Sequence, residues 1–228
     1  MKKFGLNANA LKLLAVLSMT LDHIGLLMFP QALWLRAVGR LAFPIFAFMI
    51  AEGCSHTRNM GKYLLTVGIS AALCQAVSYI ATGSLYQCIL VTFSLSIGFV
   101  WLLTLARKTK PLYWLLGFIG IGAVYFITDI LPGLLTGTDF AVDYGFLGVM
   151  LPVAIFLCRS KWQKLLIAAV LLVLQARTAL PVQWYALLSL PLLALYNGTR
   201  GKWKMKWFFY IYYPAHLAVL YVIAPFLA

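Results

Sequence analysis

Long apolar runs alternate with short polar connections along most of the chain. About 20 apolar residues suffice to cross the hydrocarbon core of a membrane. Lys/Arg clusters, or Gly, Pro and Asn residues, divide the sequence into runs of roughly that length or shorter. The predicted spans cover residues 10–29, 34–53, 63–82, 85–106, 112–131, 145–158, 164–180, 183–197 and 207–227. This pattern predicts an all-α fold, a polytopic transmembrane helix bundle of about nine spans that forms a single domain over residues 1–228.

The sixth, seventh and eighth predicted spans are shorter than the others. The break between them at Leu180-Pro181-Val182-Gln183 is the least clearly marked. A re-entrant pair of helices at this point would change the number of spans, so both arrangements stay open.

Basic residues gather in the connections between the apolar runs. The clusters are Lys2-Lys3, Arg58 with Lys62, Arg107-Lys108-Lys110, Arg159 with Lys161 and Lys164, and Arg200 with Lys202, Lys204 and Lys206. With nine spans and a cytoplasmic amino terminus, every cluster falls on the cytoplasmic side, as the positive-inside rule requires. The opposite connections, residues 30–33, 83–84, 132–144 and 181–182, contain no Lys or Arg. We therefore expect the amino terminus inside and the carboxyl terminus outside.

Composition excludes an ordinary soluble domain, because 64% of the residues are hydrophobic and only 10% are charged, against about 25% charged in soluble proteins. The net charge of +13 lies mostly in the short connections, so the membrane explains it better than nucleic acid does. The four cysteines lack C-x-x-C spacing, and we interpret them as packing residues with no metal site. The first apolar run lacks a cleavage site, so we expect it to stay as a membrane anchor.

Ionisable side chains inside the predicted spans are few, and each costs about 2.5–3.5 kcal/mol near a helix centre. Lys12 and His23 are eleven residues apart, which places them on one helix face about 16 Å apart along the axis. Asp22 points about 100° away from His23, so we expect it to pair with Arg36 or Arg40. A carboxylate that orients His23 would then come from elsewhere, with Asp129 and Asp143 as candidates. A snorkelling Lys12 and a His23 that only satisfies a helix contact are the structural alternative.

Two further polar groups lie near predicted span ends. Glu52, His56, Arg58 and Asn59 lie in the segment 51–59, which ends the second predicted helix at the cytoplasmic boundary. Its polar donors suit a phosphate-bearing ligand from the cytoplasm; an ordinary basic loop is the alternative. The segment 210–217 places Pro214 and His216 inside an apolar helix, which is typical of a cavity wall, although a belt of tyrosines at the membrane interface explains its aromatic residues equally well.

The chain resembles the TraX proteins, which are named for a conjugation protein linked to amino-terminal acetylation of pilin. The resemblance runs from end to end, and its most specific elements are Asp22-His23-Ile24-Gly25 and Gly39-Arg40-Leu41-Ala42-Phe43-Pro44. Further matching stretches are Leu11-Lys12, Met19 to Leu21, Arg36 to Val38, Ile45 to Phe48, Ala51-Glu52-Gly53, His56 to Asn59, Tyr63, Asp143-Tyr144-Gly145 with Gly148, and Tyr210 to Leu217. These proteins are in turn similar to multi-pass membrane acyltransferases whose first helix carries a basic residue, ten intervening positions and a histidine.

The resemblance implies transfer of an acetyl or other acyl group from cytoplasmic acetyl-coenzyme A to an amine or hydroxyl at or beyond a bacterial-type inner membrane. His23 would act as general base or acyl relay. The further catalytic candidates are Asp22, Asp129, Asp143 and His216; the coenzyme-binding candidates are Lys12, Glu52, His56, Arg58, Asn59 and Tyr213; and the acceptor-side candidates are Arg36, Arg40 and Tyr144. The acceptor, whether a peptide such as pilin, a glycan or a small molecule, is not defined by these residues.

Two other functions remain open from the sequence. A transporter or channel also needs charges inside the membrane. The third possibility is a noncatalytic subunit of an assembly machine, and binding of acetyl-coenzyme A would separate the first function from the other two.

Overall fold

The computed structural model describes residues 5–107 and 109–226, and these ranges contain helices and no strand. The predicted all-α class is thus confirmed for the described part of the chain. Of the basic residues discussed above, Lys2, Lys3 and Lys108 lie outside the described residues. The helices form two compact units, one made of Met1–Met49 with Cys158–Ala228 and the other of Ile50–Leu157.

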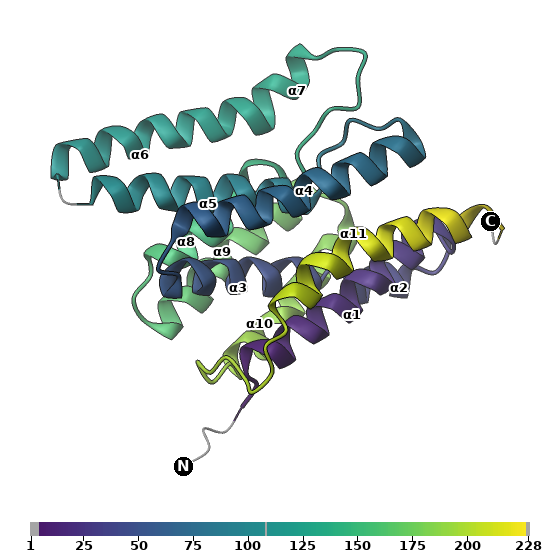
Figure 1. Cartoon of the computed structure of the whole chain (residues 1–228), viewed down its shortest axis with the longest axis horizontal. Helices are drawn as coiled ribbons and strands as arrows, with labels where there is room; N and C mark the ends of the chain where they lie inside the picture. The colour runs from purple at the N-terminus through teal and green to yellow at the C-terminus, as the bar shows by residue number, and fades with distance from the viewer. Residues whose placement is uncertain (1–4, 108, 227–228) are drawn as a thin grey trace. The chain divides into compact units, whose positions relative to one another are not determined.

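The first unit combines helices from the amino-terminal and carboxyl-terminal parts of the sequence, among them α1 and α11 (Figure 1). Its elements are α1 (Ala8–Leu27), α2 (Leu33–Gly39), the first half of α3 (Ala42–His56), α9 (Lys161–Thr178), the 3-10 helix η2 (Pro181–Leu188), α10 (Ser189–Ala194), α11 (Lys206–Ile223) and η3 (Ala224–Phe226). The second unit holds the rest of α3 with α4 (Met60–Thr82), α5 (Ile89–Ala106), α6 (Lys110–Tyr125), the π-helix η1 (Phe126–Ile130), α7 (Leu131–Leu134) and α8 (Gly145–Leu157).

Six helices in the described part of the chain have the length and apolar composition needed to cross a membrane. They cover Ala8–Leu27, Leu33–His56, Met60–Thr82, Ile89–Ala106, Lys110–Leu134 and Trp207–Phe226. These helices correspond to the first five predicted spans and the last one. The chain therefore has the long apolar helices of a multi-pass membrane protein, whereas the predicted count of nine and the orientation stay predictions.

The three remaining predicted spans form shorter or less apolar elements. Helix α8 has 13 residues, which at 1.5 Å per residue reach only about 20 Å. Helix α9 has 18 residues, or about 27 Å, but it is not among the long apolar helices. The seventh and eighth predicted spans form a hairpin of α9 with η2 and α10, in which Lys161 donates to the carbonyls of Ala194 and Tyr196 at the open end.

Helices α1 and α11 run in the same direction (Figure 1), because Lys12 lies against Phe209 and His23 against His216. If all six long helices crossed the membrane and no other element did, α1 and α11 would run in opposite directions. If all six long helices cross, the parallel pair requires an odd number of further crossings among α8, α9 and η2–α10. Seven or nine crossings meet this condition, and both put the ends of α1 and α11 at Leu27 and Ile223 on the same side.

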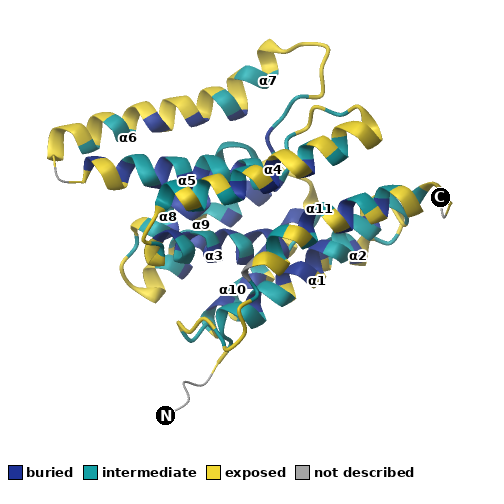
Figure 2. Ribbon diagram, viewed as in Figure 1, coloured by how far each residue is buried: buried dark blue, intermediate teal, exposed yellow. Residues whose placement is uncertain are grey.

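Helix α5 packs against α4, α6 and α8 in the second unit. Ser96 on α5 donates to the Val149 carbonyl on α8 at 2.8 Å, and Gly120 on α6 leaves room for the ring of Phe99, which would lie 2.3 Å from an added Cβ atom. Much of the remaining surface of α6 is exposed and apolar (Figure 2). Such a surface suits contact with lipid chains.

Candidate functional site

His23 on α1 and His216 on α11 lie against each other in the first unit. The distance from His216 Nε2 to His23 Nδ1 is 3.0 Å, and the ring centroids are 5.0 Å apart. His216 is buried and its Nδ1 lies 3.0 Å from the carbonyl oxygen of Tyr212, one turn earlier on α11. The two imidazoles and this carbonyl thus form a short hydrogen-bonded chain between two parallel helices.

The direction of this hydrogen-bonded chain follows from the carbonyl at its end. The Tyr212 carbonyl can only accept, so His216 Nδ1 carries a hydrogen and donates. In a neutral His216 the Nε2 atom then accepts, which makes His23 Nδ1 the donor and leaves the lone pair of a neutral His23 on Nε2. His23 Nε2 takes no part in the hydrogen bond to His216, which is made through Nδ1, and the Met19 backbone one turn earlier on α1 also interacts with the His23 ring. In this tautomer Nε2 is the imidazole nitrogen with a lone pair that can accept a proton.

Tyrosine side chains hold the histidine pair in place. The Tyr212 ring stacks on His216 with centroids 5.2 Å apart and an interplanar angle of 11°. The Thr20 hydroxyl donates its hydrogen to the Val16 carbonyl. The Tyr212 hydroxyl oxygen lies 2.8 Å from the Thr20 hydroxyl oxygen, so in this second hydrogen bond Tyr212 is the donor. Tyr213 contacts the edge of His23, with ring centroids 6.2 Å apart. These contacts fix α11 against α1 at the level of the histidines.

Asp22, the neighbour of His23, faces α2 and pairs with two arginines. Arg36 Nη1 lies 2.7 Å from Asp22 Oδ2, and Arg40 Nη2 lies 2.6 Å from both carboxylate oxygens. The predicted ion pair is confirmed, and both arginines take part in it. The three groups carry one negative and two positive charges, so an imidazolium at His23 would stand beside a centre with a surplus positive charge.

Glycines explain how the backbones of α1 and α2 come close enough for this ion pair. A Cβ atom on Gly39 would lie 2.3 Å from the Asp22 Cβ, and one on Gly25 would lie 2.8 Å from the Leu35 Cβ. Any larger residue at either place would push the two helices apart. The glycines in Asp22-His23-Ile24-Gly25 and Gly39-Arg40 are therefore packing requirements of this site.

A pair of buried glutamines extends the charged centre toward the α9 hairpin. Arg40 Nη1 donates to Gln183 Oε1 at 3.4 Å, and Gln183 Nε2 donates to Gln175 Oε1 at 3.2 Å. Asp22 is five residues before the end of α1, about 8 Å. Gln183 lies at the tip of the hairpin and contacts Arg40, which in turn contacts Asp22. The tip is therefore at the level of Asp22, near the end of α1 that is farther from Lys12.

Lys12 lies on α1 at the other end of the face that carries His23. Its Nζ is 5.5 Å from the ring centroid of Phe209 on α11, and Arg200 acts on it electrostatically. The face predicted from the eleven-residue spacing is therefore covered by α11 at both ends. The predicted role of Lys12 in binding the coenzyme stays a prediction.

The polar segment at the end of α3 and before α4 belongs to the second unit. His56 Nδ1 lies 2.8 Å from the Glu52 carbonyl, and Asn59 caps α4 by accepting from the Lys62 backbone N–H. Arg58 is exposed, and a Cβ atom on Gly53 would lie 2.5 Å from the Tyr63 hydroxyl. The coenzyme-binding roles predicted for Glu52, His56, Arg58 and Asn59 stay predictions.

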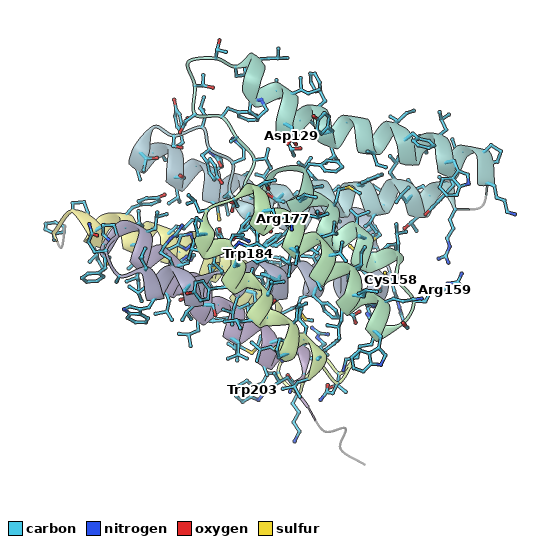
Figure 3. The ribbon with its side chains drawn as sticks, turned by 180° about the vertical axis from the view of Figure 1, so that it is seen from behind. Asp129, Cys158, Arg159, Arg177, Trp184 and Trp203 are labelled. Atoms are coloured by element: carbon cyan, nitrogen blue, oxygen red, sulfur yellow. The ribbon has the colours of Figure 1, made fainter. Side chains whose placement is uncertain are left out.

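Asp129, labelled in Figure 3, lies in the π-helix η1 and accepts a hydrogen bond from the Thr128 hydroxyl. Such π segments often occur at functional positions. Asp129 and Asp143 belong to the second unit, whereas the partner of His23 within its own unit is a second histidine. The expectation that a carboxylate orients His23 stays a prediction.

Asp143 and Tyr144 end the connection between α7 and α8. Asp143 Oδ1 accepts from the Tyr86 hydroxyl at 2.8 Å. Tyr144 has a φ angle of 62°, an uncommon value for a residue with a side chain, and a Cβ atom on Gly148 would lie 2.4 Å from the Tyr144 Cβ. This geometry explains the spacing of Asp143-Tyr144-Gly145 and Gly148, while the acceptor-side role of Tyr144 stays a prediction.

Asp139 ties the same connection to the one between α4 and α5. The Ser84 hydroxyl and the Leu85 backbone N–H donate to its carboxylate. These donors favour the ionised form, so they lower the pKa of Asp139. The carboxylate at the tip of this connection thus has a local structural role.

Sequence reasoning missed several residues of the site. Thr20 and Tyr212 lie within the family-like stretches but were assigned no role, and the glutamine pair Gln175 and Gln183 was passed over. The available signal was the presence of two glutamines on either side of Pro181 in otherwise apolar segments, because buried amides need hydrogen-bond partners.

Comparison with known proteins gives one match that covers almost the whole chain, to the family model of the TraX protein over residues 7–224. A 62-residue stretch is 44% identical to the "probable fimbrial assembly protein FimC, serogroup H1" of Dichelobacter nodosus, and it makes up 25% of each chain. A 38-residue stretch is 53% identical to an uncharacterized protein of Rickettsia prowazekii (strain Madrid E), covering 17% of this chain and 15% of the relative. These two matches thus span a quarter or less of the relatives' lengths. No solved structure matches.

Proposed function

The chain belongs to the TraX family, and on that premise we propose that it is a membrane acyltransferase that moves an acetyl group from acetyl-coenzyme A to an amine or hydroxyl. The observation that carries the proposal is the hydrogen-bonded chain from the Tyr212 carbonyl through His216 to His23. It supports a neutral His23 whose Nε2 is ready to accept a proton, as a general base must be.

The proposed reaction is a direct transfer. The acceptor amine or hydroxyl attacks the thioester carbonyl while His23 Nε2 takes its proton. The carbon–sulfur bond then breaks, and the imidazolium returns the proton to the departing coenzyme thiolate. His216 accepts a hydrogen bond from His23 Nδ1 throughout, which favours the tautomer that the first step needs.

The charged centre beside His23 fits this chemistry. Arg36 and Arg40 carry one more positive charge than Asp22 neutralises, and they are fixed by the ion pair. A fixed positive charge stabilises the oxyanion that develops when the thioester carbonyl is attacked. The same surplus charge opposes a resting imidazolium at His23.

The α1 face that carries Lys12 at one end and His23 at the other fits the two ends of acetyl-coenzyme A. Lys12 is four residues after the start of α1 and His23 four residues before its end, so each lies about 6 Å from a helix end. The coenzyme carries its phosphates far from its thioester, at opposite ends of the pantetheine arm. We propose that Lys12 contacts phosphate at the cytoplasmic side while the thioester reaches His23.

The acceptor belongs to the far side of the membrane in this proposal. With the start of α1 in the cytoplasm, His23 lies in the outer half of the membrane. The name of the Dichelobacter nodosus relative refers to fimbrial assembly, which favours a fimbrial or pilin subunit as the acceptor. The amino terminus of such a subunit would supply the amine.

The proposal is tested with the purified full chain and radiolabelled acetyl-coenzyme A. His23→Asn keeps an N–H donor for His216 but has no basic nitrogen, so we expect it to bind the coenzyme and to lose transfer. Mass spectrometry of cells with the natural gene, the variant or no gene would identify the missing acetyl group. Leu17→Ala, on the exposed side of α1, is the matched control and should retain transfer.

Two results would overturn the proposal. One is normal transfer by folded His23→Asn, which would remove His23 as the base. The other is the absence of acetyl-coenzyme A binding by the natural chain, which would favour a transporter, a channel or a noncatalytic assembly subunit.

A further inference from the structure

The connection between α10 and α11 is fastened to the start of α1. The Ala8 backbone N–H donates to the Thr199 carbonyl at 2.8 Å, and the Asn9 N–H donates to the Arg200 carbonyl at 3.3 Å. The Asn9 side chain donates to the Trp203 carbonyl at 2.8 Å. The basic residues of this connection are therefore held beside the first turns of α1.

Gly201 makes this close approach feasible. Its φ angle is 92°, a value that residues with a Cβ atom rarely adopt. An added Cβ would also lie 2.8 Å from Asn7 Oδ1 and 3.0 Å from Asn9 Nδ2. A side chain at this position would move the connection away from α1.

Four basic side chains gather at the start of α1 and on the α10–α11 connection, and no acidic side chain among the described residues pairs with them. Lys12 is half-buried and close enough to Arg200 for the two charges to repel, while Lys202 and Lys204 are exposed on the same connection. Among the residues that the structure describes, no acidic side chain forms an ion pair with Lys12, Arg200, Lys202 or Lys204. The Phe209 ring offsets part of the cost of burying the Lys12 ammonium, but it accepts no ordinary hydrogen bond from it.

We infer that the start of α1 and the α10–α11 connection form a binding site for a phosphate-bearing anion. Arg200 presents a planar pair of donors that matches phosphate, Lys12 adds an ammonium from the helix, and Lys202 and Lys204 add charge. The site would neutralise cations that the chain brings together and leaves without a counter-charge.

Two kinds of phosphate-bearing molecule, a lipid and a nucleotide, can reach this site. Trp203 and Trp207 are 70% and 65% exposed, and Trp203 is labelled in Figure 3. Exposed tryptophans of membrane proteins gather at the level of the lipid headgroups, where both an acidic phospholipid and a water-soluble nucleotide are accessible. The nucleotide source rests on the proposed function, whereas the lipid source does not.

The first experimental arm measures nucleotide phosphate. Adenosine 3′,5′-bisphosphate, which lacks the acyl group, is titrated into the full chain in nanodiscs of neutral phosphatidylcholine. We expect Arg200→Ala with Lys202→Ala to weaken binding about tenfold or more, since each lost contact involves a charged group. Arg107→Ala with Lys110→Ala removes the same charge from another basic connection and should leave binding unchanged. Gly201→Ala keeps every charge and should weaken binding by displacing the connection.

The second arm measures lipid phosphate. The same variants are purified from membranes that contain phosphatidylglycerol, and the retained lipid is counted by mass spectrometry. A loss of lipid in the Arg200 and Lys202 variant, relative to the Arg107 and Lys110 variant, supports the site with a headgroup as its ligand. A loss of nucleotide binding in the first arm supports the site with a nucleotide as its ligand.

The inference fails if the two double variants behave alike in both arms. Its failure can be distinguished from that of the proposed function, because both readouts are binding and neither needs transfer. Retained phosphate binding in a chain without transfer activity would refute the proposed function alone. Normal transfer together with unchanged binding in the Arg200 and Lys202 variant would refute this inference alone.

Discussion

Replacing Asp22 by Asn tests how much the ion pair of Asp22 with Arg36 and Arg40 stabilises the folded chain. The substitution keeps the size of the side chain but removes the carboxylate that pairs with Arg36 and Arg40. The side chains of Asp22, Arg36 and Arg40 are 14%, 19% and 13% exposed. In the variant two guanidinium groups would therefore remain largely buried without the carboxylate that pairs with them.

The expected cost follows from this burial. Breaking a buried ion pair by removing one partner costs about 3–5 kcal/mol, which for a chain of this length lowers the melting temperature by roughly 6–20 °C. Arg40 contacts both oxygens of Asp22 and Arg36 contacts one, so Arg40→Gln should destabilise more than Arg36→Gln. Because the partners are coupled, Asp22→Asn with Arg40→Gln should cost less than the sum of the two single changes.

Thermal unfolding of the purified chain in one detergent provides the measurement. Leu17→Ala changes an exposed side chain of the same helix and is the control, expected to melt near the natural chain. Equal melting temperatures for Asp22→Asn and Leu17→Ala would show that the ion pair does not stabilise the first unit. Additive effects in the double variant would show that Asp22 and Arg40 are not coupled.

Three further predictions concern topology, pH and the histidine pair. Reporters placed in the α1–α2 connection and after α11 should show the same side of the membrane, because α1 and α11 are parallel; opposite sides would refute the odd number of crossings. A reporter between α9 and η2 separates nine crossings from seven in which α8 or α9 is the added one. The pKa of Asp139 is lowered, so its contact with Leu85 should contribute fully above about pH 4 and be lost as the pH falls through the lower folded-state pKa. The protection factor of the Leu85 amide in hydrogen exchange measures this loss. Asp139→Ala, which removes the acceptor, should lower the protection factor at pH 7 and abolish its fall at low pH; an unchanged protection factor in that variant would contradict the contact. His216→Ala should lower kcat and change the pH profile of kcat without raising KM for acetyl-coenzyme A. His216→Gln keeps an acceptor for the His23 N–H and should restore part of the rate. An unchanged kcat in folded His216→Ala would show that His216 does not position His23.

Local spacing allowed part of the site to be predicted. The period of 3.6 residues placed Lys12 and His23 on one face and turned Asp22 away from His23 toward the arginines. The long helices could be recognised because runs of 18 or more apolar residues are rarely ambiguous. The short helices α8 and η2–α10 could not be assigned with the same ease, since apolar runs of 13 or 14 residues occur both in spans and in packed segments.

Long-range contacts account for what the sequence did not indicate. His23 and His216 are 193 residues apart, and nothing in their local sequences says that α1 and α11 run side by side. The same holds for the bonds that join Arg40 to Gln183 and Gln183 to Gln175. Burial of the amides, and not their spacing, requires these partners.

Asp22 and His23 act on different neighbours, and this difference predicts the effect of losing either arginine. Because adjacent helical residues point about 100° apart, Asp22 holds α2 while His23 contacts α11. The ion pair therefore fixes the rotation of α1 that presents His23 to His216. If Arg36 and Arg40 are positioning residues, Arg36→Gln should lower kcat and stability together while KM for the acceptor changes little. A raised acceptor KM at unchanged stability would instead assign Arg36 to acceptor binding, as the resemblance alone implied.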